Sequence, residues 1–214
     1  MQYNPVHIRA GFVVVNCDSE KDQRRTAMVD KNKVYVHLAD GFEEIEALTT
    51  VDLLRRVGVD VQTVKIGGND DLMVRGTHDI WVQADVLFAE ADYKSCNMIV
   101  LPGGLPGTTN LGDHEALMKQ VNEFAKDGKY VAAICAAPML LGREGLLEGK
   151  RATIYPGMEG ELKGAEYHND VTAKDGNIIT GRGPAAAMEF ALKIIATLCG
   201  DEKSREIAED LTLI

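Results

Sequence analysis

A short, wholly apolar run at residues 131–134 ends abruptly at Cys135 and is followed at once by small residues and Pro138. Such a run is typical of a strand buried on both faces in a parallel sheet. Proline is tolerated only in the first turn of a helix, so residues 136–142 are predicted to form a helix. Cys135 is therefore expected on a sharp strand-to-helix turn, a nucleophile elbow with sulfur as the nucleophile. A buried structural cysteine is the alternative, because free thiols are often buried.

The rest of the chain alternates short apolar runs with amphipathic segments. Further strands are predicted at residues 33–38, 59–66, 97–101 and 151–155, with hairpins at 72–83 and 171–180. Further helices are predicted at residues 43–57, 113–126 (with Asp113 as the N-cap) and 184–198. Strands that alternate with helices indicate an α/β protein. We expect a single doubly wound, flavodoxin-like domain whose mostly parallel sheet is sandwiched by helices.

Two further strand ends carry residues suited to a site. The run at 97–101 ends in the motif LPGG (residues 101–104), and the run at 33–38 is followed by DGFEEIE (residues 40–46). Glycines directly after a strand allow the backbone to approach a ligand closely. Sites in open α/β sheets lie beyond the carboxyl ends of the strands, so both segments are expected to meet Cys135 there.

Taken together, these motifs resemble the DJ-1/PfpI (ThiJ-like) superfamily, and most closely its DJ-1-like branch. The resemblance runs from about residue 33 to residue 199. It rests on the glutamate-rich helix start, LPGG, AAICAAP (residues 132–138) and TGRGP (residues 180–184). It implies a reactive Cys135 beside a protonated glutamate, which by its position in the motif is Glu46. It also implies a homodimer, with Arg182 in a loop near the site and the subunit interface.

A free cysteine with a pKa near 8.5 is only about 3% thiolate at pH 7, so a working nucleophile needs a lowered pKa. A helix N-terminus alone lowers the pKa too little, so direct hydrogen bonds to the sulfur must lower it further. We expect these from the backbone N–H groups of Gly104 and Ala136, which would also form an oxyanion hole. The Cys135–Glu46 pair is expected to titrate together, with the pKa of Glu46 raised and that of Cys135 lowered. Gly103 is expected to support this site.

One residue departs from the family pattern. Many members place a histidine near the cysteine, at a strand end before a proline, whereas this chain has Tyr155 before Pro156. Tyrosine is a poor base at neutral pH, which disfavours a Cys-His peptidase or amidotransferase. Tyr155 is expected to support the site in another way. His37 or His168 could approach the site, although ordinary packing or surface roles are favoured for both.

Composition limits the partners, cofactors and cellular location expected for the chain. A net charge of −10 argues against nucleic acid or an anionic membrane as a partner. The four cysteines show neither zinc-binding spacing nor a disulfide framework, so we expect no metal, no cofactor and a cytoplasmic location. Residues 1–32 are polar and lack periodicity, which predicts a weakly ordered extension, with Met28 as a plausible start, before a DJ-1/PfpI-like domain at 33–214.

The resemblance implies action on small reactive carbonyls. Cys135 would attack an α-oxoaldehyde such as methylglyoxal, as in a glutathione-independent glyoxalase, or a glycated adduct, as in a protein deglycase. One alternative is an oxidative-stress sensor or chaperone in which Cys135 is oxidised to the sulfinate. A second alternative is a PfpI-type cysteine peptidase or amidotransferase-like hydrolase.

Overall fold

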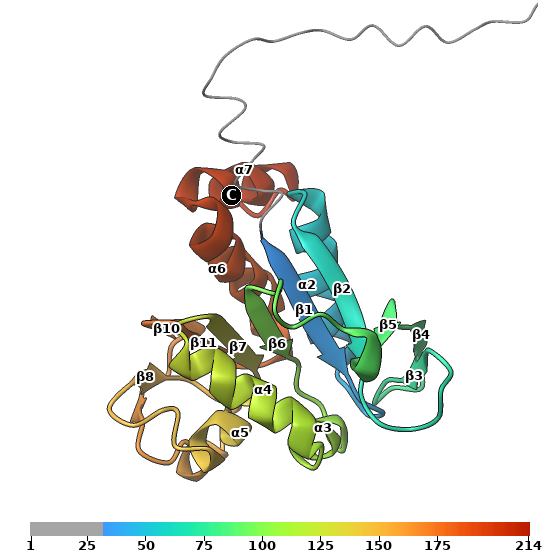
Figure 1. The fold of residues 1–214 in the computed structure, drawn as a ribbon. Coiled ribbons are helices and arrows are strands. Elements are labelled where there is room, and N and C mark those ends of the chain that lie inside the picture. The colour runs from blue at the N-terminus through green and yellow to red at the C-terminus, as the bar shows by residue number, and fades with distance from the viewer. Residues whose placement is uncertain (1–31) are drawn as a thin grey trace, which may run out of the picture.

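The computed structural model describes residues 32–214 (Figure 1). The extension expected at residues 1–32 therefore lies, apart from Asn32, outside the described residues, as does Met28. A seven-stranded sheet forms the centre of the molecule, and its strands are β1 (Lys33–Leu38), β2 (Asp60–Lys65), β5 (Val86–Leu87), β6 (Met98–Leu101), β7 (Tyr130–Ile134), β10 (Thr172–Asp175) and β11 (Ile178–Gly181).

The strands lie in the order β10-β11-β7-β6-β1-β2-β5, and every neighbouring pair is parallel except β10 with β11. The five strands from β2 to β11 follow the flavodoxin-like order, with the chain reversing direction across the sheet between β1 and β6. The predicted doubly wound, mostly parallel α/β fold is confirmed. The carboxyl ends of β1, β6 and β7 lie at one edge, where the three motifs follow them.

Helices cover both faces of the sheet (Figure 1). One face packs against α2 (Glu44–Arg56), α6 (Ala187–Cys199) and α7 (Asp201–Asp210), and the other against α3 (Gly107–Gly112), α4 (Glu115–Lys126) and α5 (Pro138–Arg143). The alternation within β1 produces this division, since Val34 and Val36 face the α2–α6 side and Tyr35 faces the α4 side. No helix within residues 32–214 is long and apolar enough to cross a membrane.

Two small sheets and three short 3-10 helices complete the described chain. The predicted hairpin at 72–83 is present as antiparallel β3 (Met73–Arg75) and β4 (Trp81–Gln83). The 3-10 helices are η1 (Phe88–Glu90), η2 (Glu159–Glu161) and η3 (Pro184–Ala186). The strand predicted at 151–155 shrinks to β8 (Arg151–Ala152), which pairs with β9 (Glu166–Tyr167) outside the main sheet. The rest of the segment predicted as a strand makes other hydrogen bonds. The Thr153 N–H donates to the Thr180 hydroxyl, and the Tyr155 N–H donates to the Cys135 carbonyl.

Several helix boundaries differ from the prediction for local reasons. The N-cap of α4 is His114 and not Asp113, because the Nδ1 atom of His114 accepts a hydrogen bond from the Leu117 N–H. Helix α5 begins at Pro138, and the two alanines before it belong to the turn. The helix predicted at 184–198 opens with the 3-10 turn η3 before α6. Helices α3 and α7 were not predicted, since each is short and carries few apolar residues.

Candidate active site

Cys135 follows β7 with a backbone φ of +64°, a conformation that non-glycine residues seldom adopt. Hydrogen bonds on both sides hold it there. Its N–H donates to the Gly181 carbonyl at 2.9 Å, and its own carbonyl accepts from the Tyr155 N–H at 2.9 Å. Such strain persists where the surroundings over-determine the backbone. The elbow geometry expected from the sequence is therefore present, with Cys135 only 8% exposed.

The start of α2 presents Glu46 to the elbow. The Glu43 side chain caps the helix by accepting a hydrogen bond from the Glu46 N–H at 2.8 Å. The loop after β6 joins the same point, because Gly103 donates its N–H to Glu46 Oε2 at 2.8 Å and accepts from the Glu43 N–H at 2.9 Å. Glu46 is fully buried by these contacts.

Gly103 is the residue that allows the three segments to meet. A Cβ at this position would lie 2.6 Å from the Cys135 Cβ and 2.7 Å from Glu46 Oε2. Real side chains essentially never approach this closely, so the loop needs a glycine here. Gly103, Glu46 and Cys135 thus form one compact group drawn from β6, α2 and β7.

Burial raises the pKa of Glu46 to about 7, and the nearby Glu43 carboxylate adds to the effect. Hydrogen bonds from the Gly103 N–H and from Cys135 lower this pKa only in part. The second oxygen, Oε1, is buried and has no hydrogen-bond partner within the described residues. Because no donor in the described residues stabilises a charge on this oxygen, the neutral carboxyl is favoured, and the pKa of Glu46 is raised in the direction expected from the sequence.

The pKa of the Cys135 thiol differs from the expectation that it is lowered. Burial, followed by the charge and the hydrogen bond of Glu46, raises the pKa of Cys135 to about 12, although N–H groups of Ala136 and Gly104 act in the opposite direction. The repulsion requires Glu46 to be ionised. With the proton on Glu46, the repulsion disappears and the carboxyl donates to the sulfur. Between these two pKa values the pair holds one proton, and the thiolate forms when that proton is on Glu46.

Tyr155 and Arg182 both line a cleft of about 340 Å³, whereas neither Cys135 nor Glu46 lines it. Tyr155 is 47% exposed and packs near Gly183, while Arg182 donates from Nη1 to the Asn169 side chain at 3.2 Å. The Tyr155 backbone is bonded to Cys135. The residues named as supporting the site are thus neighbours of the elbow.

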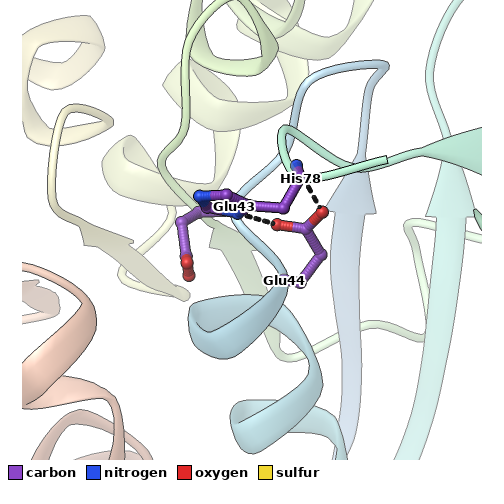
Figure 2. A group of neighbouring side chains, drawn as sticks. All are labelled: Glu43, Glu44 and His78. Atoms are coloured by element: carbon purple, nitrogen blue, oxygen red, sulfur yellow. Dashed lines mark hydrogen bonds and ion pairs between the residues drawn. The ribbon is translucent and has the colours of Figure 1, made fainter. Parts of the chain in front are cut away.

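Two histidines have partners other than the thiol. His37 is buried, with Nε2 2.8 Å from the Tyr93 hydroxyl and Nδ1 3.3 Å from the Val100 carbonyl, and burial lowers its pKa to about 3. The packing role favoured for His37 is therefore the one observed. His78 pairs with Glu44, Nδ1 to Oε2 at 2.8 Å (Figure 2). The sequence analysis missed this pair because its members are 34 residues apart and no local pattern joins them.

The fold and the elbow define an α/β protein with a cysteine at a strand-to-helix turn. The family model for the DJ-1/PfpI family matches residues 32–197. The Drosophila melanogaster protein dj-1beta is 39% identical over 178 residues, which cover 82% of this chain and 94% of the fly protein. The chain belongs to the DJ-1/PfpI family, and these likenesses place it in the DJ-1-like branch.

Two further relatives bear on function. A Schizosaccharomyces pombe protein named glutathione-independent glyoxalase DJ-1 is 28% identical over 189 residues, covering 85% of this chain and 98% of the yeast protein. A solved structure of oxidized Toxoplasma gondii DJ-1 superposes with a TM-score of 0.80 at 35% identity, covering 85% of this chain and 98% of that chain.

Proposed function

We propose that this protein is a cysteine-dependent glyoxalase that acts on small α-oxoaldehydes without glutathione. The observation that carries the proposal is the contact between Cys135 on its positive-φ elbow and the buried Glu46 carboxyl. The name of the yeast relative supports the same activity. Removal of glycation adducts would use the same first step, and we include it as a related activity.

In the proposed mechanism, the Cys135 thiolate attacks the aldehyde carbon of methylglyoxal. The resulting oxyanion takes hydrogen bonds from the N–H groups of Gly104 and Ala136 and then receives the proton of Glu46, which gives the hemithioacetal hydroxyl and leaves Glu46 ionised. Glu46 removes the proton from the former aldehyde carbon and returns it to the neighbouring carbon through an enediol, which leaves a lactoyl thioester. Water cleaves this thioester to lactate and restores the thiol. The reaction is an internal redox exchange, so no external oxidant is consumed.

Glu46 is suited to this proton transfer because burial raises its pKa to about 7, where a group can both accept and release a proton. Tyr155 has no comparable basicity, since the ordinary phenol pKa is near 10. Tyr155 and Arg182 line a cleft, and the Tyr155 N–H is bonded to the Cys135 carbonyl; we propose that the two side chains position the substrate.

The test is lactate formation from methylglyoxal in the absence of glutathione. We expect activity in the parent protein and its loss in Cys135→Ser and Glu46→Leu. Cys199→Ser is the matched control, because this half-buried cysteine ends α6 and should leave activity unchanged. An active Cys135→Ser variant, or a parent protein without lactate production, would refute the proposal.

An oxidative-stress sensor is the second candidate, favoured by the limited exposure of Cys135 at 8%. Peroxide is small enough to reach such a thiol, and the unpartnered Glu46 Oε1 could donate a hydrogen bond to a sulfinate oxygen. Cys96 is buried and burial raises its pKa to about 11, so it should react later. Peroxide titration with peptide mass spectrometry should show Cys135 oxidised first, without lactate production, if this function is the true one.

The cysteine peptidase has less support. No hydrogen bond joins a histidine to Cys135 in residues 32–214. The chaperone alternative rests on no specific contact. The cytoplasm stays our proposed location, supported by the free thiols of Cys96, Cys135 and Cys199.

We also infer a homodimer. Ile45 and Leu48 project from α2 with 57% and 36% exposure, and Trp81 of the adjoining hairpin is 58% exposed. The hairpin is tied to the start of α2 by the Thr77 N–H, which donates to the Phe42 carbonyl at 2.8 Å. Exposed apolar side chains of this kind are suited to a protein partner.

A further inference from the structure

We propose that Glu43, Glu44 and His78 bind one divalent transition-metal ion of the zinc class. Each residue offers one ligand atom, and these atoms lie within 4.8 Å of one another. Figure 2 shows the two glutamates at the start of α2 and the histidine on the β3–β4 hairpin turn beside them. The site is separate from the Cys135–Glu46 pair and does not depend on the proposed glyoxalase activity.

The first argument is the charge that α2 buries. Glu43 is 6% exposed and Glu44 is 4% exposed, so two carboxylates lie side by side with little access to water. His78 is the ion-pair partner of Glu44. No lysine or arginine within residues 32–214 forms an ion pair with Glu43. Buried charges are normally paired or coordinate a metal, and a divalent cation here would balance the second carboxylate.

The second argument is that the ligands are presented by a rigid frame. The His78 backbone N–H donates to Glu44 Oε1 at 2.7 Å, and a Cβ on Gly76 would collide with the Glu44 carboxyl. The hairpin turn is thereby locked against α2. Glu43 uses Oε2 to cap the helix, which leaves Oε1 as its ligand atom.

The third argument concerns the ion. His78 Nδ1 and Glu44 Oε2 are 2.8 Å apart and share a proton, whose place the metal would take. Zinc binds imidazole nitrogen and carboxylate oxygen at about 2.0–2.2 Å, which requires ligand atoms roughly 3.3 Å apart in a tetrahedron. The side chain of His78 is 67% exposed, so it can rotate to widen the 2.8 Å between its Nδ1 and Glu44 Oε2 to roughly 3.3 Å. Three protein ligands and a water complete the coordination. Magnesium prefers oxygen ligands alone and should not bind.

The test is calorimetric titration of the metal-free full-length protein with Zn²⁺. We expect one equivalent to bind, and to bind equally in Cys135→Ser, which removes the reactive thiol. His78→Ala and Glu43→Gln should each weaken binding at least tenfold, since even the loss of an outer-shell partner costs about 10–100-fold in affinity. Glutamine can still cap α2 through its side-chain oxygen, so Glu43→Gln should fold.

Matched controls distinguish this site from others on the chain. His168→Ala and His7→Ala should bind zinc as the parent does, and Mg²⁺ should produce no heat. Co²⁺ in place of Zn²⁺ should give tetrahedral absorption without a thiolate charge-transfer band. Thermal unfolding should show a zinc-dependent rise in Tm that His78→Ala abolishes. The proposal is wrong if zinc binds His78→Ala and Glu43→Gln as tightly as the parent, or if Cys135→Ser or His7→Ala removes binding.

Discussion

At the scale of single residues, the position of one proton decides the chemistry of this protein. Glu46 and Cys135 are both buried and share that proton. When the proton is on sulfur, the Glu46 carboxylate opposes ionisation of the thiol, and when it is on Glu46, the carboxyl stabilises the thiolate. The same contact can therefore suppress or promote the reactivity of the Cys135 thiol, and the pH dependence of thiol alkylation distinguishes the two effects.

We predict that the shared proton resides on Glu46 in the reactive state. In Glu46→Leu the thiolate loses its donor, so the midpoint of the alkylation rate against pH should rise by more than about one unit relative to the parent protein. Glu46→Gln, which still donates a hydrogen bond, should shift the midpoint less. Iodoacetamide kinetics monitored at Cys135 give the measurement. A midpoint that falls in Glu46→Leu would show that Glu46 is the ionised member of the pair.

Glu46 should also make stability depend on pH. Its folded-state pKa of about 7 lies above the ordinary value of 4.5, so its protonated form favours the folded state. The contribution is complete below about pH 4.5 and is lost as pH rises through 7, up to about 3 kcal/mol. Urea unfolding at pH 5 and pH 7.5 should show the parent losing about 2 kcal/mol of this contribution relative to Glu46→Gln. The contribution of His37 to the pH dependence is the same in both proteins and cancels in the comparison. Parallel profiles of the free energy of unfolding against pH would therefore contradict the prediction.

At the scale of secondary-structure elements, the site depends on how closely three chain segments approach one another. Gly103 of the loop after β6 contacts both the N-terminal turn of α2 and the elbow after β7. The backbone of the elbow is held in turn by Gly181 at the end of β11 and by the segment at Tyr155. Each functional group is thus positioned by an element other than its own.

Gly103→Ala should separate these elements. The added methyl overlaps the Cys135 side chain and the Glu46 carboxyl, so we expect a loss of about 1–3 kcal/mol in the free energy of unfolding. Lactate production should fall more than tenfold, because a misplacement of about 1 Å can cost 100-fold in rate. Gly160→Ala is the control, since a Cβ there meets nothing within 4 Å. Equal stability and activity in the two variants would disprove the tight packing at Gly103.

At the scale of the whole molecule, the outer side of α2 and the β3–β4 hairpin present apolar side chains to solvent. The same two elements carry Glu44 and His78, whose ion pair joins them. An interface on this surface would lie close to both the Cys135 pair and the proposed metal site. Assembly and chemistry are therefore expected to influence each other.

Trp81→Glu should convert the inferred dimer to a monomer, because a charge would replace a large exposed aromatic side chain on the inferred interface. Light scattering coupled to size exclusion should show the mass halved at micromolar concentration. Tyr167→Glu is a matched control on β9, where a tyrosine is 39% exposed. The same halving in Tyr167→Glu, or a monomeric parent protein, would contradict this surface as the interface.

The sequence by itself determined the fold class, the strand ends that carry the motifs and the turn at Cys135. Apolar runs and glycines encode these features locally, as at Gly58, whose φ of +78° ends α2 where the pattern predicted. The strand ends also indicated that the segments at 101–104 and 40–46 would meet Cys135, because parallel strands end at a common edge, and the resemblance to the family singled out Glu46.

Only the tertiary structure decided which groups are buried together. Three glutamates within four residues, Glu43, Glu44 and Glu46, are all buried. The Glu44–His78 pair, the Tyr155 N–H on the Cys135 carbonyl and the raised pKa of the thiol all depend on segments distant in sequence. Local patterns specify which face of an element is apolar, whereas desolvation and partner choice arise only when elements pack. That is why the position of Cys135 could be predicted and its protonation could not.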